Sequence, residues 1–456
     1  MSSAPSSPFR SASFRRLWWG QSFSQFGSHA GLLLLPLLAV LALDADADHL
    51  GALRAVEQAP VLLLSLFAGA WVDRLRPRDV MVSADAGRAL ALVSVGGAYW
   101  FGVLGMETLF VVAFLMGTLT VFFDVAYQSS LVQLVRRDQL TEANSALEGS
   151  RSVAQFGGPA LGGGLLSVLS VPVAALVNAA FFVLSLLALR SIKGGRPGDE
   201  QGGQRDERGR PRDGRGGPRD EPDGARDEPG GPRDRRGRPL APVPVLRRIR
   251  DGVRHVVGEA SLRAVALATA LFQFSFAALM TVYLVFLPRE LGLSPGAVGL
   301  VLGALGPGAV VGSLLAARLP GRYGYGRVLV GAAVLGDGMM LCVPALHGSG
   351  VGTVLALAGL NFLFGALGQL VNVAMMSVRQ ALTPVRLQGR VVATVNFVGM
   401  GLTPLGSLLG GWLAGQWGLR TSLLVTAASL ALSPLFMTLS PLARLGNELP
   451  SRSEGS

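Results

Sequence analysis

Several residue types that carry chemistry are scarce in this sequence. Of its 456 residues one is cysteine, Cys342, so no disulfide can form within the chain. The single lysine, Lys193, does not follow a Gly-x-x-x-x-Gly pattern, which excludes a nucleotide-binding phosphate loop. The four histidines are scattered without metal-ligand spacing, and no nucleophile elbow of a hydrolase is present. We therefore expect neither an enzyme nor a bound metal or other cofactor.

Charged residues are also few, and apolar residues fill long stretches of the chain. Only 15% of the residues are charged, against roughly 25% in a soluble domain, and 50% are hydrophobic. A helix that crosses a bilayer needs about 20 mostly apolar residues. Segments of this kind recur along the chain, and the first is too long for a cleavable signal peptide. They predict an all-α membrane protein with six plus six spanning helices, at 17–43, 51–71, 80–104, 108–134, 145–169 and 172–192, then at 262–288, 295–318, 328–346, 351–378, 390–414 and 419–440.

The basic residues fall on alternate connections between these segments. Most arginines lie on one side together with both termini, whereas the other side carries few arginines and the acids Asp44, Asp46 and Asp48. This asymmetry predicts a multi-pass protein of the cytoplasmic membrane with cytoplasmic termini. The net charge of +11 has nucleic-acid binding as an alternative explanation. We reject it because membrane topology already explains where the arginines lie.

A polar block at 194–239 divides the chain into two similar halves. It lacks apolar residues, so it cannot bury enough surface to offset the entropy of ordering. We expect a tether, with a regulatory segment as the alternative. A basic amphipathic helix at the inner membrane surface is expected after it. The predicted parts are a tail (1–16), a first bundle (17–192), a disordered linker (193–243), the interfacial helix (244–260), a second bundle (261–441) and a tail (442–456).

The two halves carry corresponding landmarks. A glycine-led segment at 69–78 has a counterpart at 312–327, and the glycine-proline segment at 157–164 has one at 403–411. Pro159 and Pro404 are 245 residues apart, close to the 243 residues between Gly69 and Gly312. Duplicated halves of this kind are expected of secondary transporters whose site lies between the repeats.

At these landmarks the chain resembles the major facilitator superfamily. Its signature Gly-x-x-x-Asp-Arg-x-Gly-Arg-Arg is matched at Gly69, Asp73, Arg74 and Arg78, while Arg76 and Pro77 depart from it. Residues 14–27 and 143–164 are similar to the first and fifth helices of drug- and macrolide-efflux members. The resemblance implies two pseudo-symmetric six-helix bundles that export a small amphipathic compound in exchange for protons. It also implies a monomer with a small-molecule substrate and no nucleic-acid partner. An importer or facilitator on the same fold is the alternative, and a non-transporting scaffold or sensor is another.

The resemblance also implies roles for two motifs. Asp73 and Arg74 would form an inner gate against the helix that opens near Arg390, with plain anchoring by positive charge as the alternative. The second motif is expected to let its helix bend or slide, although static close packing explains its glycines almost as well. It comprises Gly157, Gly158, Pro159, Gly162 and Gly163.

Ionisable residues within membrane helices are costly, so each needs a partner or a role. Asp124, in a helix that lines the central cavity of the superfamily, is the candidate for exchanging a proton, with a structural ion pair as the alternative. Asp85 with Arg88, and Glu148 with Arg151, stand three residues apart, which favours local ion pairs. Asp337 has no obvious partner, and the family places its helix at the periphery.

Polar side chains on three of the predicted helices are candidates for contacting substrate. Hydrogen bonding between helices is the alternative for each amide. The interleaved Phe272, Phe274 and Phe276 suit an apolar or amphipathic substrate. The cavity candidates are Gln21, Gln25, Gln273, Tyr283, Gln369 and Asn372.

Overall fold

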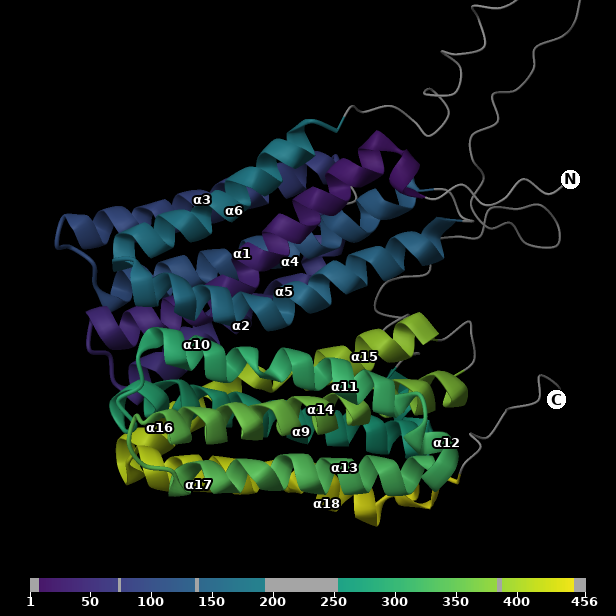
Figure 1. The fold of residues 1–456 in the computed structure, drawn as a ribbon. Helices are drawn as coiled ribbons and strands as arrows, with labels where there is room; N and C mark the ends of the chain where they lie inside the picture. Colours follow the sequence, from purple (N-terminus) through teal and green to yellow (C-terminus); the bar gives the residue numbers. More distant parts are fainter. Residues whose placement is uncertain (1–7, 73–74, 136–138, 193–252, 384–387, 447–456) are drawn as a thin grey trace, which may run out of the picture.

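The computed structural model describes residues 8–72, 75–135, 139–192, 253–383 and 388–446. In these ranges the chain is helical and contains no β-strand. The first half forms six long helices that pack as one bundle (Figure 1). They are α1 (Ala12–Ala42), α2 (Ala47–Val72), α3 (Pro77–Trp100), α4 (Met106–Leu134), α5 (Leu140–Val168) and α6 (Val171–Arg190).

The second half also crosses the molecule six times, but several of its passes are interrupted. The intact passes are α9 (Ala260–Arg289) and α14 (Val351–Leu382). The interrupted ones pair α10 (Pro295–Gly303) with α11 (Leu305–Ala316), α13 (Tyr325–Met339) with the 3-10 turn η3 (Met340–Ala345), α15 (Gln388–Gly401) with α16 (Thr403–Trp417), and α17 (Leu419–Leu430) with α18 (Leu432–Leu439). The short α12 (Leu319–Tyr323) precedes α13.

Each interruption lies about four residues before a proline. A proline at position i has no N–H to bond the carbonyl at i−4, and its ring clashes with that carbonyl. Pro307 and Pro344 stand four residues after Gly303 and Met340, where α10 ends and η3 begins. Pro404 and Pro434 stand four residues after Met400 and Leu430, within a residue of the ends of α15 and α17. These breaks allow the passes of the second half to bend.

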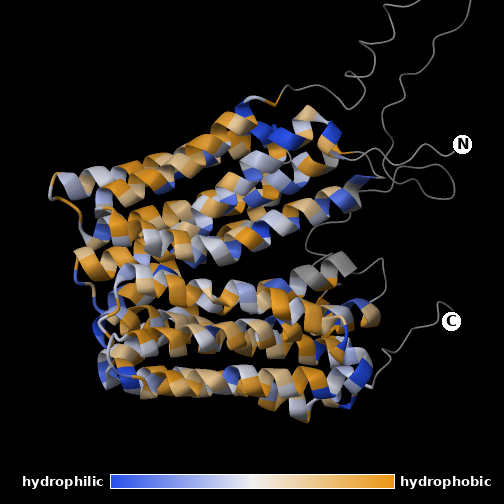
Figure 2. Ribbon diagram, viewed as in Figure 1, coloured by the Kyte–Doolittle hydropathy of each residue, from blue (hydrophilic) through white to orange (hydrophobic). Residues whose placement is uncertain are grey.

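The predicted all-α membrane fold is confirmed. Within the described residues, ten helical passes are long and apolar enough to span a membrane. The other two passes, α2 and α5, have 26 and 29 residues. They also pack against the opposite half, α2 on α16 and α5 on α10. Figure 2 shows apolar residues along the helices and hydrophilic residues gathered mainly toward their ends.

The predicted and observed helices agree to within a few residues, with one informative difference. Helix α1 begins five residues before the predicted start, because Ser11 caps it: its hydroxyl accepts a hydrogen bond from the amide of Phe14 at 3.3 Å. Residues 253–258 are helical. The rest of the expected interfacial helix up to residue 252, and the linker, lie outside the described residues.

The two halves share a core at one end only. The largest apolar cluster joins Leu33–Val40 of α1 and neighbouring residues to residues 279–293 and 298–302 of α9 and α10. We call this end, which carries the α1–α2 and α9–α10 connections, the closed end. Toward the end that carries both chain termini, each half has a separate core. The ribbons of the halves diverge in that direction (Figure 1).

Candidate functional site

A cavity of about 340 Å³ lies within the second half, with Gln155 of α5 at its edge. Its walls come from α9, α11, α13, α14 and α18. Three of the cavity candidates from the sequence, Gln273, Gln369 and Asn372, line it. Small-molecule sites commonly have about 300–1,000 Å³ with mostly apolar walls and a few polar groups. This cavity meets that description.

The cavity also contains a carboxylate that sequence reasoning set aside. Asp337 of α13 lines the wall and is 6% exposed. Its carboxylate forms no ion pair or hydrogen bond with any other described residue. The lining also includes Phe272, Phe276 and Phe364; the rings of Phe272 and Phe276 stack with a centroid separation of 5.5 Å, and those of Phe276 and Phe364 with 5.9 Å.

The remaining cavity candidates lie elsewhere. Tyr283 is 1% exposed, and its hydroxyl accepts a hydrogen bond from Asn361 at 2.8 Å within the core of the closed end. Gln21 of α1 is 3% exposed, with an oxygen that has no hydrogen-bond partner among the described residues. Gln25, one turn further along α1, is half-buried. These three do not line the cavity of the second half.

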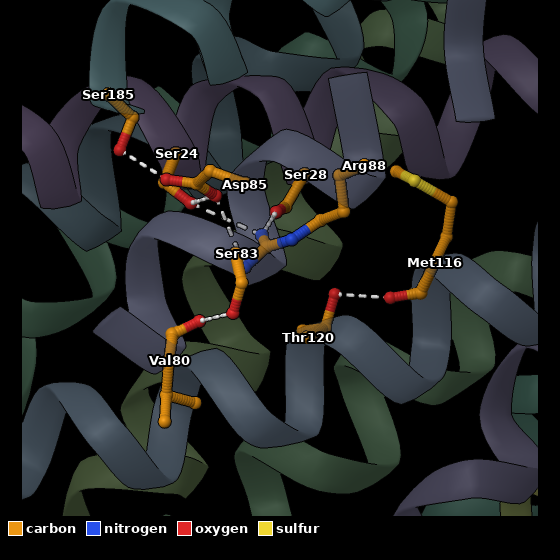
Figure 3. Close-up of polar contacts among 9 residues, drawn as sticks. All are labelled: Ser24, Ser28, Val80, Ser83, Asp85, Arg88, Met116, Thr120 and Ser185. Atoms are coloured by element: carbon orange, nitrogen blue, oxygen red, sulfur yellow. Dashed lines mark hydrogen bonds and ion pairs between the residues drawn. The ribbon is translucent and has the colours of Figure 1, made fainter. Parts of the chain in front are cut away.

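The first half contains a buried ion pair. Arg88 Nη2 lies 3.3 Å from Asp85 Oδ1, and the two side chains are 1% and 0% exposed. Hydroxyls from α1 and α6 complete the carboxylate's surroundings: Ser24 donates to it at 3.1 Å and Ser185 at 2.5 Å (Figure 3). Arg88 in turn donates to Ser24 at 3.2 Å and Ser28 at 3.1 Å. The pair therefore joins α1, α3 and α6.

Aromatic rings cover the same arginine. The guanidinium of Arg88 lies 4.5 Å from the ring centre of Phe123 and 5.1 Å from that of Phe182. A cation over an aromatic face is attracted by the ring quadrupole, the more so when water is excluded. Asp124 follows Phe123 on α4 and interacts electrostatically with Arg88 and Arg151. Arg88 is thus paired with Asp85, and Asp124 is a second carboxylate whose charge acts on it.

The second pair that the sequence singled out has a different environment. Arg151 and Glu148 approach to 3.7 Å, but their side chains are 56% and 71% exposed. Exposed pairs contribute only about 0–1 kcal/mol. The same three-residue spacing thus produces a buried network in α3 and a solvated contact in α5.

The glycines of the α5 motif let two neighbouring helices approach closely. A Cβ added at Gly158 or Gly162 would meet the backbone of α1 at His29 and Ala30 within 3.0 Å. One added at Gly163 would lie 2.6 Å from the Cα of Gly299 in α10. Static packing therefore accounts for these glycines in this conformation. Gly157 meets only the ring of Phe26 at 3.5 Å, an ordinary contact distance, and Pro159 lies within continuous α5.

A matching glycine contact joins α2 to α16. A Cβ added at Gly51 would lie 3.0 Å from the Cα of Gly411. The halves thus meet through two glycine-faced crossings, α5 with α10 and α2 with α16, both toward the closed end. The pairing was not visible in the sequence, because Gly51 and Gly299 belong to no motif.

The proposed gating motif is only partly within the described residues. Asp73 and Arg74 lie outside them, and Gly69 and Arg390 are described only as backbone positions of α2 and α15. Arg78 donates hydrogen bonds to the carbonyl oxygens of Leu189, at 3.1 Å, and Arg190. A cation at these last carbonyls of α6 stabilises the helix end.

Ion pairs join the two halves at the closed end, opposite to the end that carries the proposed gating motif. Arg289, at the end of α9, contacts Asp44 at 2.6 Å and Asp46 at 3.2 Å in the α1–α2 connection. The sequence places Asp44 and Asp46 together on one side of the membrane but indicates no partner for them. Arg54 and Glu57, which no sequence motif singled out, lie inside α2.

Comparison with known proteins agrees with this architecture. The profile described as Major Facilitator Superfamily matches residues 17–257, more than half of the chain, and one described as Transmembrane secretion effector matches residues 232–454. The chain belongs to the major facilitator superfamily. It is 28% identical over 387 residues to the multidrug efflux pump Tap of Mycolicibacterium fortuitum, covering 82% of each chain. It is 27% identical over 169 residues to the uncharacterised transporter YfiS of Bacillus subtilis (strain 168), covering 37% of this chain and 39% of that one.

Solved structures show the same fold at low sequence identity. A bacterial homologue of the iron transporter ferroportin in an inward-facing state aligns with a TM-score of 0.67 and 16% identity, covering 94% of this chain and 98% of that one. A bacterial homologue of the lysosomal transporter Spinster, inward-facing and occupied, aligns with a TM-score of 0.68 and 13% identity, covering 96% and 98%. The chain is therefore a multi-pass membrane transporter by family, and these structures share its fold.

Proposed function

We propose that this transporter exports small amphipathic compounds from the cytoplasm in exchange for protons, as a monomer that works by alternating access. The contact between the halves is the observation that carries the proposal. They share a core at the closed end and have separate cores at the other. The similarity to a multidrug efflux pump over 82% of each chain supports export.

The closed end is built so that it can separate. Its polar contacts, from Arg289 to Asp44 and Asp46, involve carboxylates that are 96% and 75% exposed, and such pairs are weak. The glycine crossings interlock backbones without large side chains, so little must be rearranged when they part. With the termini in the cytoplasm, as the arginines predict, this conformation faces inward. Gly69, Asp73, Arg74 and Arg390 would then form the inner gate of the outward-facing state.

We assign proton exchange to Asp124. It is half-buried on α4 and interacts electrostatically with Arg88, whose principal partner is Asp85. A proton on Asp124 removes its attraction for Arg88 and leaves the Asp85 pair intact. The protein with a proton on Asp124 and the protein without it would therefore differ in how α3 and α4 are held together. Such a difference between the two protonation states is the coupling that an antiporter needs.

Transport into inside-out vesicles tests the proposal. Vesicles with the wild-type protein should take up ethidium when a proton gradient, acidic inside, is imposed, and should release protons as they do so. Asp124→Asn should abolish gradient-driven uptake while leaving exchange of ethidium across the membrane in the absence of a gradient. Glu107→Gln, an exposed carboxylate in the first turn of α4, is the matched control and should transport normally.

Two results would overturn parts of the proposal. Full gradient-driven uptake by Asp124→Asn would remove this residue from proton exchange and leave export standing. Failure of the wild type to move any amphipathic probe in either direction would remove export itself. Deletion of residues 194–240 should leave transport unchanged, and its loss would favour a role for the linker beyond tethering.

A further inference from the structure

We propose that the cavity of the second half binds a monovalent, lipophilic organic cation, with Asp337 as its counter-charge. The inference rests on the proposed function in one respect only, because it takes the occupant of the cavity to be the transported compound. The binding itself is a property of the described residues.

The first argument is the unpaired carboxylate. Asp337 is 6% exposed and lines the cavity. Among the described residues that line the cavity with it there is no lysine, arginine or histidine, and no described residue forms an ion pair or hydrogen bond with its carboxylate. Burying an isolated carboxylate is costly unless a partner compensates its charge. A cationic occupant supplies the partner that the protein lacks there.

The second argument is the aromatic wall. Phe272 and Phe276 stack at 5.5 Å with an interplanar angle of 10°, and Phe276 and Phe364 stack at 5.9 Å with 12°. All three line the same cavity. Aromatic surface attracts organic cations through the ring quadrupole and also buries their apolar bodies. A small, strongly hydrated cation gains little from such a wall.

The other polar groups in the lining favour an adaptable contact. The hydroxyls of Thr269 and Ser433 already donate hydrogen bonds to backbone carbonyl oxygens, those of Val265 and Ala268 respectively. Gln273, Gln369 and Asn372 make no hydrogen bond to another described residue, so their carboxamides are available to an occupant. Carboxamides can donate or accept, which suits cations that differ in their attached groups.

The same lining argues against other ligand classes. An anion would face Asp337 with no basic residue among the described lining residues. A divalent metal ion needs several oxygen, nitrogen or sulfur ligands. No group of three or more histidine, cysteine, aspartate or glutamate side chains comes together within the described ranges.

The cavity is also placed where movement of the halves would alter it. Gln155 at its edge belongs to α5 of the first half, and α5 contacts α10 through Gly303 on Ala160 and Gly299 on Gly163. Separation of that crossing would withdraw Gln155 from the edge. A bound cation would thus lose part of its surroundings when the closed end opens.

Binding to the purified full-length protein in lipid nanodiscs tests the inference without requiring transport. The probe is radiolabelled tetraphenylphosphonium, and neutral triphenylphosphine oxide is the matched uncharged ligand. Tetraphenylphosphonium has no N–H or O–H to donate, so its attraction to the Asp337 carboxylate is that between opposite charges in a site shielded from water. Asp337→Asn removes this attraction and should weaken binding of the cation at least about tenfold. The affinity of the Asp337→Asn variant for the neutral ligand should differ from that of the wild type by less than about twofold. Asp337→Glu should recover much of the cation affinity, and Glu107→Gln should match the wild type.

A second variant tests the cavity without touching its charge. A Cβ added at Gly368 meets nothing within 4 Å, although the residue lines the cavity. Gly368→Leu should therefore fold and fill part of the cavity, and should weaken both ligands. Gel filtration and thermal unfolding show whether each variant is folded.

The outcomes separate the binding site from the proposed function. Unchanged cation affinity in folded Asp337→Asn, equal losses for both ligands, or no binding of the cation by the wild type would each overturn the site. Selective loss in Asp337→Asn together with a wild type that transports no probe in vesicles would support the site and overturn export.

Discussion

Arg289 of the second half reaches Asp44 of the first, with Nη2 2.6 Å from Oδ1, across the closed end of the molecule. Asp46 adds a second contact to the same guanidinium at 3.2 Å. Arg289 stands 245 residues after Asp44 and 243 after Asp46, and the pairing ties the end of α9 to the α1–α2 connection. These are contacts that must break whenever the halves separate at this end.

Arg289→Ala should shift the conformational equilibrium toward opening of the closed end. The carboxylates are exposed, so each of the two pairs contributes about 1 kcal/mol or less, and the ratio of states should change roughly thirtyfold or less. Distance measurements between spin labels at Glu107→Cys and Val351→Cys, in a Cys342→Ser background, report on this end. Arg289→Lys keeps the charge and should change the distribution less. An unchanged distance distribution in Arg289→Ala would show that the ion pairs do not hold the end closed.

Substitution of the buried pair Asp85–Arg88 should lower the free energy of unfolding far more than substitution of the exposed pair in α5. Removal of one partner from a buried ion pair costs about 3–5 kcal/mol, because the other charge stays buried. Asp85→Asn or Arg88→Met should therefore lower the free energy of unfolding strongly, and the double variant should cost less than the sum. Glu148→Gln with Arg151→Gln is the control and should cost about 1 kcal/mol or less. Thermal unfolding in detergent measures all four, and equal losses for the buried and exposed pairs would contradict the assignment.

Much of the architecture follows from patterns that a linear sequence displays directly. Length and apolarity place the helices to within a few residues, since a bilayer fixes both. The breaks in the second half also follow a local rule, with Pro307, Pro344, Pro404 and Pro434 each freeing a carbonyl four residues earlier. A proline alone does not predict a break, however, because Pro36 and Pro159 lie inside helices that remain continuous.

The partners of the polar side chains could not be predicted from the sequence in the same way as the helices. Sequence spacing treats Asp85 with Arg88 and Glu148 with Arg151 alike, because it records neighbours on one helix only. The difference comes from Ser24 and Ser185 on other helices. Asp337 was set aside for a related reason: family position describes a whole helix, whereas the cavity depends on which face of α13 meets α14.

The glycine crossing between α5 and α10 gives a prediction with a neighbouring control. A Cβ at Gly163 would lie 2.6 Å from both the Cα of Gly299 and the carbonyl oxygen of Pro295, which are backbone atoms that cannot rotate away. Gly163→Ala should therefore push the halves apart at a cost of about 1–3 kcal/mol. Gly164→Ala meets nothing within 4 Å and should be neutral or stabilising by up to about 1 kcal/mol. The same spin-label distances measure the opening, and similar distributions in the two variants would show that the crossing tolerates added bulk.

The hydrogen bond between Tyr283 and Asn361 distinguishes a structural residue from one that contacts substrate. Tyr283→Phe removes the acceptor of a buried bond of 2.8 Å and should lower the free energy of unfolding by about 1 kcal/mol. Because Tyr283 does not line the cavity, competition between different transported compounds should stay as in the wild type. Gln369→Leu, in the cavity wall, should change the order of preference among the same compounds while costing little stability. A changed preference in Tyr283→Phe would mean that this side chain contacts substrate in another state of the cycle, as its position on the seventh predicted helix first suggested.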